Sequence, residues 1–237
     1  MDGKIETSLK NPKYIRLSYT LGKASPVHIG LPQPDIKPIN QISKGDNYNT
    51  SLLTVENHCG THIDAPAHFI QGGRLISDYG PDELTFSHPL VLDCPKSPGE
   101  LVDIEDVSKI SYENIDCLLL CTGFYQYHDT DWEKYLEQNP GLSPGAVHYL
   151  REKFPNLRCV GIDTISMSRY GHAEEAVKVH QTGFMEKEGF GKPLLFVEDL
   201  DLSALDGKVE LEQVLVVPWQ VDGLDGAPCT VLARIKT

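Results

Sequence analysis

Apolar stretches of strand length recur along the chain, and short polar segments separate them. Several of these stretches are unbroken rather than alternating, which is typical of strands covered on both faces. Proline and glycine are scattered between them, as expected where many strands end in turns. The pattern predicts strands at 14–19, 51–55, 89–92, 115–121, 158–162, 194–197, 213–217 and 230–235.

Helical periodicity occupies some of the intervening segments. Ser143 followed by Pro144 is typical of a helix start, because serine caps the first turn and proline fits the first helical position. A short helix is predicted at 130–138 and the longest at 172–187. The face of the longest helix carries Ala173, Val177, His180 and Phe184. Strands outnumber helices, so we predict a single α/β domain over 1–237 with a mixed, β-rich sheet and flanking helices.

Composition narrows the class of protein. The chain has 237 residues, 40% hydrophobic and 23% charged, which is ordinary for a soluble protein. A formal net charge of -13 argues against nucleic-acid binding, which needs clustered lysine and arginine. No window approaches the ~18 apolar residues of a membrane helix, and the first residues lack the apolar stretch of a secretory signal. We therefore expect a cytoplasmic protein with no nucleic-acid or membrane partner.

The six cysteines form no C-x2-C pair, which disfavours a structural zinc knuckle or a thioredoxin-type site. Cys117 and Cys121 flank a run of leucines and are predicted to lie in the core of a strand. Reduced and mostly buried thiols fit a cytosolic protein.

Candidate chemistry is concentrated between residues 58 and 68, in the pattern H-x3-H-x-D-x3-H. The spacing of His58 and His62 places both on one face of a helix or of a strand. Gly60 and Pro66 make a long helix unfavourable, so we predict a strand that ends in a turn. Two imidazoles and a carboxylate are typical of a hydrolytic metal site with an open position. A single core histidine needs no such explanation, but three with an aspartate at ligand spacing favour a metal site.

The segment HCGTHIDAPAHF resembles the H-x-G-T-H-x-D-x-P-x-H-F signature of the cyclase family, which includes bacterial kynurenine formamidases and isatin hydrolases. The likeness extends over nearly the whole chain, in order. The further matching segments are Leu17-Ser18, the V-G-I-D run at 160–163 with Ser166, PLLFVEDL at 193–200 and the G-A-P run at 226–228.

The resemblance implies a swivelling β/β/α fold, assembled as a homodimer or homotetramer. It implies that His58, His62 and Asp64 are metal ligands and that His68 is the catalytic acid/base. In two-metal members of the family the aspartate bridges to a second ion, which a histidine on a late helix and a glutamate complete. The best matches for these two ligands are His180 and Glu198.

His172 competes with His180, because it lies two turns away on nearly the same helical face. His180 is preferred because it lies in the middle of the apolar stripe, where a buried imidazole needs a partner. The alternative for His180 is a core histidine bonded to a carbonyl. Glu198 ends an apolar strand, where burial is costly without a cation; its alternative is an exposed strand end. The separation of the two residues implies an insertion around 185–191.

Two features depart from the family pattern. The chain lacks the aromatic-Pro-Gly-Asp turn near 27–30 and the arginine that often follows the G-A-P run, where it has Cys229 and Thr230. Both regions could shape the substrate pocket or the dimer edge. The remaining histidines have no convergent partners in the sequence and are interpreted as surface or structural residues: His28, His88, His128 and His148.

These observations predict a hydrolase that binds one or two divalent ions, zinc or manganese, and acts on a small-molecule amide. An arylformamidase acting on N-formylkynurenine, in tryptophan catabolism, is the leading hypothesis. Hydrolysis of a cyclic amide such as isatin, or of a lactone, is the alternative. A catalytically silent metal-binding protein is a third hypothesis, which the presence of His68 disfavours. The sequence has no G-x-S-x-G, H-E-x-x-H or P-loop motif that would suggest a different chemistry.

Overall fold

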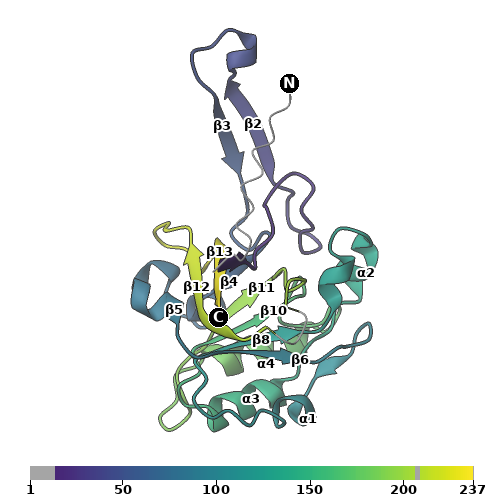
Figure 1. Ribbon diagram of the computed structural model, residues 1–237, viewed down its shortest axis with the longest axis vertical. Coiled ribbons are helices and arrows are strands. Elements are labelled where there is room, and N and C mark those ends of the chain that lie inside the picture. The colour runs from purple at the N-terminus through teal and green to yellow at the C-terminus, as the bar shows by residue number, and fades with distance from the viewer. Residues whose placement is uncertain (1–13, 206–208, 237) are drawn as a thin grey trace.

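The computed structural model describes residues 14–205 and 209–236, and one large mixed sheet organises them (Figure 1). The strands run in the order β5-β12-β13-β4-β11-β10-β8-β6, and β1 also pairs with β13. Their bounds are β1 (Tyr14–Arg16), β4 (His62–Asp64), β5 (Thr85–Phe86), β6 (Pro89–Asp93), β8 (Cys117–Cys121), β10 (Cys159–Ile162), β11 (Leu195–Glu198), β12 (Leu211–Pro218) and β13 (Gly226–Ile235).

The sheet has a parallel half and an antiparallel half, which meet at β4. Strands β6, β8, β10 and β11 pair in parallel, whereas β4 pairs antiparallel with both β11 and β13. In the parallel half every residue of Cys117–Cys121 is buried, as the unbroken apolar run predicts. The antiparallel half curls back, so that β12 also contacts β6.

Among the described residues, three α-helices cover one face of the sheet, whereas the helix that carries Tyr135 packs with Phe124 and Ile165 in a separate cluster (Figure 1). Their bounds are α1 (Ile104–Val107), α2 (Trp132–Glu137), α3 (Pro144–Lys153) and α4 (Ala173–Phe184). The predicted start of α3 is confirmed, because the Ser143 hydroxyl accepts a hydrogen bond from the Ala146 amide (3.0 Å). The prediction of 172–187 for α4 is too long, since Met185 takes an extended conformation and ends the helix. Among the described residues, no helix has the length and apolar character that crossing a membrane requires.

Two packed cores lie on the two faces of the sheet. One core joins the helices to the parallel strands and includes Val147, Val179 and Phe196. The other fills the concave side of the curled antiparallel half and includes Leu17 and Val214. The predicted mixed, β-rich α/β fold is confirmed.

The run at 51–55 forms a strand but not a core strand. It becomes β3 (Thr50–Thr54), which pairs with β2 (Asp35–Asn40) in a hairpin that projects from the body (Figure 1). Every residue of β3 is exposed. The sequence pattern missed β2, which carries a proline, the two-residue strand β5, and the short parallel pair β7 (Leu101–Val102) and β9 (Gly141–Leu142). Strands of two residues are too short to show a pattern of apolar and polar positions.

Helix α4 approaches β11 closely at Gly183. A Cβ atom at this position would lie 2.4 Å from Cζ of Phe196 and 2.9 Å from its Cε2. Glycine inside a helix costs about 1 kcal/mol relative to alanine, so close packing is the reason for it here. Because α4 carries His180 and β11 carries Glu198, this contact also sets how near those two residues lie.

We predict that Gly183→Ala destabilises the protein by about 1–3 kcal/mol, because the methyl group would push against the buried Phe196 ring. Gly145→Ala in α3 is the matched control: its Cβ would lie 3.3 Å from Cδ1 of the exposed Ile104, which has room to move. Urea unfolding of both variants, measured in chelator, compares their free energies of unfolding. A Gly183→Ala protein as stable as wild type would show that the helix is not held at this contact.

Candidate metal centre and active site

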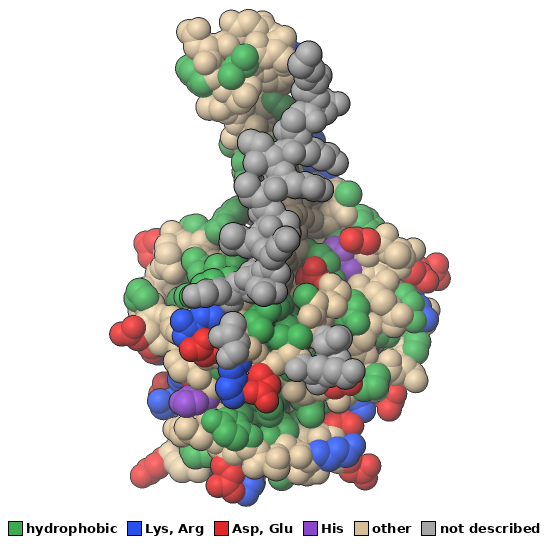
Figure 2. Space-filling view, in the orientation of Figure 1, with side chains coloured by type: hydrophobic (Ala, Val, Ile, Leu, Met, Phe, Trp, Pro, Cys, Tyr) green, Lys and Arg blue, Asp and Glu red, His purple; other side chains and the backbone are tan. Residues whose placement is uncertain are grey.

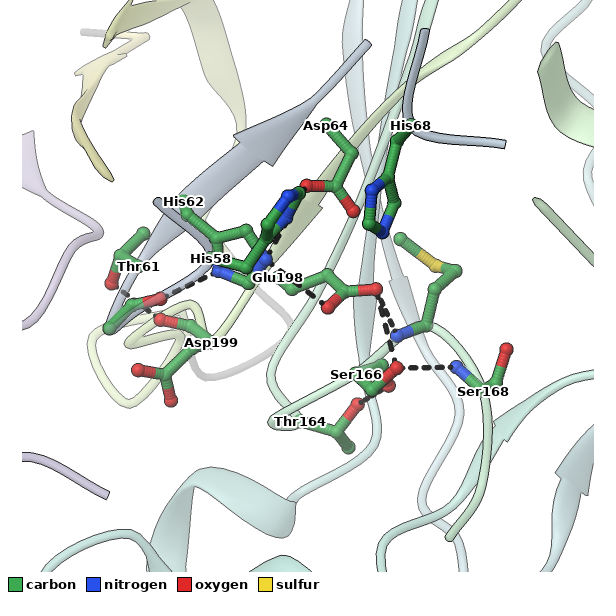
Figure 3. A network of polar contacts seen from close by, with 12 residues as sticks. His58, Thr61, His62, Asp64, His68, Thr164, Ser166, Ser168, Glu198 and Asp199 are labelled. Atoms are coloured by element: carbon green, nitrogen blue, oxygen red, sulfur yellow. Dashed lines mark hydrogen bonds and ion pairs between the residues drawn. The ribbon is translucent and has the colours of Figure 1, made fainter. Parts of the chain in front are cut away.

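Strand β4 holds the centre of the candidate site. Figure 3 shows the side chains of His58, His62, Asp64, His68 and Glu198 pointing toward one another. His62 and Asp64 lie at the two ends of β4, on one face of the strand. The predicted strand ending in a turn is confirmed, since a 3-10 turn follows at Pro66–His68. His58 precedes the strand, so it and His68 reach the site from turns rather than by strand alternation.

Asp64 lies at the junction of two groups of candidate ligands. The ligand atoms of His58, Asp64 and His68 lie within 4.8 Å of one another, and so do those of His62, Asp64 and Glu198. Oδ1 of Asp64 lies 2.7 Å from Nδ1 of His58 and 3.5 Å from Nε2 of His62. This shared carboxylate is the arrangement that a bridging role would require.

The two distant residues lie where the sequence hypothesis needs them. Glu198 is the register partner of His62 across β4 and β11, and its Oε2 lies 3.4 Å from Nε2 of His62. Its Oε1 lies 3.5 Å from Nε2 of His180. Both Glu198 and His180 are buried. His172, the competing candidate, is exposed beside the start of α4, so the fold brings His180 and not His172 next to Glu198.

Hydrogen bonds orient the two buried imidazoles. The Nδ1–H of His62 donates to the Gly60 carbonyl and that of His180 donates to the Ala176 carbonyl, each at 2.8 Å. In a neutral ring this arrangement leaves Nε2 with its lone pair, and in both residues Nε2 faces Glu198. A backbone carbonyl on the far nitrogen is the usual support of a metal-binding histidine. His180 is therefore a core histidine bonded to a carbonyl and also a candidate ligand.

The electrostatics of the buried group favour added positive charge. Burial alone would lower the pKa of His62, but the carboxylates of Asp64 and Glu198 outweigh it and raise that pKa to about 10. Burial likewise opposes charge on His180, whose pKa is nevertheless raised by Glu198. For Glu198, burial would raise the pKa, yet His180 and His62 hold it well below its ordinary value. Buried carboxylates that need nearby positive charge, with imidazole nitrogens beside them, fit a divalent cation such as zinc or manganese.

Sequence reasoning missed Asp225. Its Oδ2 accepts a hydrogen bond from Nδ1 of His68 (2.7 Å) and lies 3.3 Å from Nε2 of His58. Burial would raise the pKa of Asp225, but the bond from His68 and the charge of His58 lower it. The available signal was its position directly before the G-A-P run. A Cβ on Gly226 would lie 2.5 Å from Cε1 of His58, so glycine lets β13 pass against the site.

A cavity of about 600 Å³ opens over these residues, a size suited to a small molecule. Its walls include the apolar side chains of Leu31, Phe69 and Ile165. His28 also lines it and is exposed, so it is a surface residue at the edge of the cavity. His128 does not line it: its ring is buried and stacks on Tyr19, with ring centroids 3.4 Å apart, as a structural residue would.

We predict that His62→Ala or Asp64→Ala removes most of the divalent metal from the purified protein. Loss of groups that merely support ligands typically costs 10–100-fold in metal affinity, so loss of a ligand should cost more. His172→Ala, an exposed histidine at the mouth of the same cavity, is the control and should retain metal. Elemental analysis of the three proteins provides the measurement. Wild-type metal content in both ligand variants would show that the metal binds elsewhere.

The chain is similar to known proteins in both sequence and structure. The family model described as "Putative cyclase" matches residues 15–169. The kynurenine formamidase of Geobacillus thermodenitrificans is 26% identical over 234 residues, which cover 95% of this chain and 99% of that protein. Isatin hydrolase A from Ralstonia solanacearum has a similar structure, with a TM-score of 0.75 and 20% identity over 93% of this chain and 90% of that one. A predicted metal-dependent hydrolase from Bacillus stearothermophilus matches with a TM-score of 0.67 and 23% identity, over 93% and 97% of the two chains.

Proposed function

The chain belongs to the cyclase family as a hydrolase-type enzyme, and we propose that it hydrolyses the amide bond of an arylformamide, with N-formylkynurenine as the leading substrate. The observation that carries the proposal is the contact between His68 and Asp225 beside the shared carboxylate of Asp64. A protein that only stored metal would not need an imidazole oriented by an acid at the edge of the substrate cavity.

When bound, a divalent cation supplies Lewis acidity toward the amide carbonyl and makes a water molecule more acidic. The protein's own part is proton transfer and positioning. Asp225 accepts the Nδ1–H of His68, which fixes the ring and leaves Nε2 free to move a proton. The leaving amine must gain a proton, and general acid help of this kind is worth ~10²–10⁴-fold. His58 stacks on His68, with centroids 4.0 Å apart, and further limits how that ring can turn.

The cavity supports a flat, partly apolar substrate. Phe69 stacks on His180, with ring centroids 4.3 Å apart, and forms an aromatic wall next to the candidate ligands. Ile165 and Val177 add apolar surface to the same cavity. An aryl ring can pack on these side chains while its amide reaches Glu198 and His68. A cyclic amide of the isatin type has the same features, and the likeness to isatin hydrolase structures makes it the second candidate.

The ligand set in this proposal is His58, His62 and Asp64 for one ion, with Asp64, His180 and Glu198 for a second. Zinc and manganese both accept imidazole and carboxylate ligands. We also propose that the enzyme works in the cytoplasm, because all six cysteines are free and buried, as in a reducing compartment.

We further propose that the enzyme is a homo-oligomer in which the β2–β3 hairpin packs on a second copy. A two-stranded hairpin alone is marginally stable in water. This hairpin nevertheless carries large apolar side chains that are each more than half exposed, some visible at its tip in Figure 2: Ile39, Ile42, Tyr48, Leu52 and Leu53. The body presents a matching apolar rim at the cavity mouth in Tyr170 and Val177. Exposed apolar patches of this kind mark interaction surfaces. In a dimer the hairpin of each copy would pack on the apolar rim of the other.

We expect the metal-loaded protein to release formate from N-formylkynurenine, to lose this activity in chelator and to regain it with zinc or manganese. Isatin and an aryl lactone complete the substrate panel. His68→Ala should keep near-normal metal content but lose ~10²-fold or more in turnover, because proton transfer and not metal binding is removed. Asp225→Asn, which keeps the shape of the side chain, should lose less.

Metal content and rate must come from the same preparation, because activity lost together with metal would make His68 a ligand. Full turnover in metal-loaded His68→Ala would refute the acid/base role. No hydrolysis of any member of the panel by metal-loaded wild type would leave the amide-hydrolase proposal without support.

For the assembly, light scattering after size exclusion should give at least the mass of a dimer for wild type. A Leu52→Glu, Leu53→Glu double variant should shift toward monomer, because charge would be buried in the contact. Val217→Glu, which changes an exposed valine on the body, is the control and should not shift. A monomeric wild type, or a double variant that stays dimeric, would contradict the hairpin contact.

A further inference from the structure

A second set of polar contacts lies directly behind the candidate metal residues, around Asp199. This residue follows Glu198 at the end of β11 and is fully buried. Its φ angle is 56°, and among the residues that the structure describes no other non-glycine residue has a positive φ. Because this conformation crowds the Cβ of an L-amino acid, surrounding contacts must hold Asp199 in it.

Three hydrogen bonds hold it, each from a different part of the chain, and Nε2 of His128 also lies 3.7 Å from its Oδ1. The Asp199 amide donates to the Thr164 carbonyl (2.8 Å), in the loop after β10. Its carbonyl accepts from the Thr61 hydroxyl (2.5 Å), one residue before β4. Its Oδ1 accepts from the Tyr135 hydroxyl (2.5 Å), on α2. The backbone and the side chain of Asp199 are therefore both fixed.

These contacts join the residues on either side of the candidate ligands. Thr61 precedes His62, and Asp199 follows Glu198, so one hydrogen bond ties together the segments that carry both (Figure 3). The loop that accepts the Asp199 amide also donates from the Met167 amide to Oε1 of Glu198 (2.6 Å). A change in the backbone at Asp199 would move the Glu198 side chain relative to His62.

A role in the core alone does not account for this residue. An apolar side chain would fill the same space without burying a carboxylate, and it would avoid the cost of desolvating one. Among the described residues, Oδ2 of Asp199 has no hydrogen-bond partner. Aspartate tolerates the left-handed conformation, and its Oδ1 accepts from the Tyr135 hydroxyl and lies 3.7 Å from Nε2 of His128.

We propose that Asp199, held by Tyr135 and Thr61, is a positioning residue that sets the orientation of the Glu198 carboxylate for metal binding. The inference rests on the proposed ligand role of Glu198. Asp199 itself faces away from the cavity and does not line it. Its effect passes through the backbone at the end of β11.

The test is titration of the metal-free protein with Co²⁺, followed by visible absorption, which reports both affinity and coordination geometry. Asp199→Ala should weaken binding of the Glu198-dependent ion on the order of tenfold, because alanine both loses the Tyr135 contact and disfavours the left-handed conformation. Asp199→Asn should stay close to wild type, since asparagine tolerates that conformation and keeps an oxygen acceptor. Tyr135→Phe should weaken binding in the same direction, and it tests the inference should Asp199→Ala fail to fold.

Two further variants complete the design. Tyr79→Phe removes the hydroxyl of another buried tyrosine, one stacked under Arg74, and should leave the Co²⁺ titration unchanged. Glu198→Gln removes the proposed ligand directly and shows how far Co²⁺ affinity falls when that ligand is lost. If Glu198→Gln weakens binding while Asp199→Ala and Tyr135→Phe only lower thermal stability, the positioning role is wrong and the ligand role stands. If Glu198→Gln leaves Co²⁺ binding unchanged, the ligand role and this inference fall together.

Discussion

The pairing of β4 with its two neighbours is the constraint on which the site depends. This strand has three residues and lies where the parallel half of the sheet meets the antiparallel half. On one side it sets His62 opposite Glu198, and on the other it sets Asp64 opposite Gly226. A shift of one residue in either register would turn the ligand side chains to the other face of the sheet. The long strands and two cores around β4 hold that register.

The same pairing buries two carboxylates that need positive charge nearby. Buried Asp64 and Glu198 would be costly in a low-dielectric interior without positive charge nearby. Protonated imidazoles can supply that positive charge, as the raised pKa of His62 shows. A proton and a divalent cation are therefore alternative partners for the same carboxylates, and binding of a cation would release protons. This coupling links the stability of the fold to the chemistry of the site.

The candidate ligands and the residues that line the cavity mouth lie on different kinds of structural element. The candidate ligands lie on strands and on a packed helix, where neighbouring side chains limit their motion. His28, Arg169 and Tyr170 line the cavity from loops, where sequence can change without disturbing the sheet. The departure from the family pattern near 27–30 falls in such a loop, where His28 lines the cavity. The loop residues that line the cavity and the candidate ligands thus lie on separable parts of the chain.

The sequence by itself determined the fold class, most strands and helices, and the segment at the centre of the candidate site. Unbroken apolar runs and the Ser143 cap act locally, and the histidine and aspartate spacing of 58–68 resembles one family closely. Only the tertiary structure decided what distant segments bring together. His180, and not His172, lies beside Glu198, because α4 packs closely on β11 at Gly183. Asp225 lies next to His68 because β13, from the C-terminal part of the chain, pairs with β4. The run at 51–55 was apolar enough for a core, yet pairing only with β2 left it exposed, since burial depends on which strand is the neighbour.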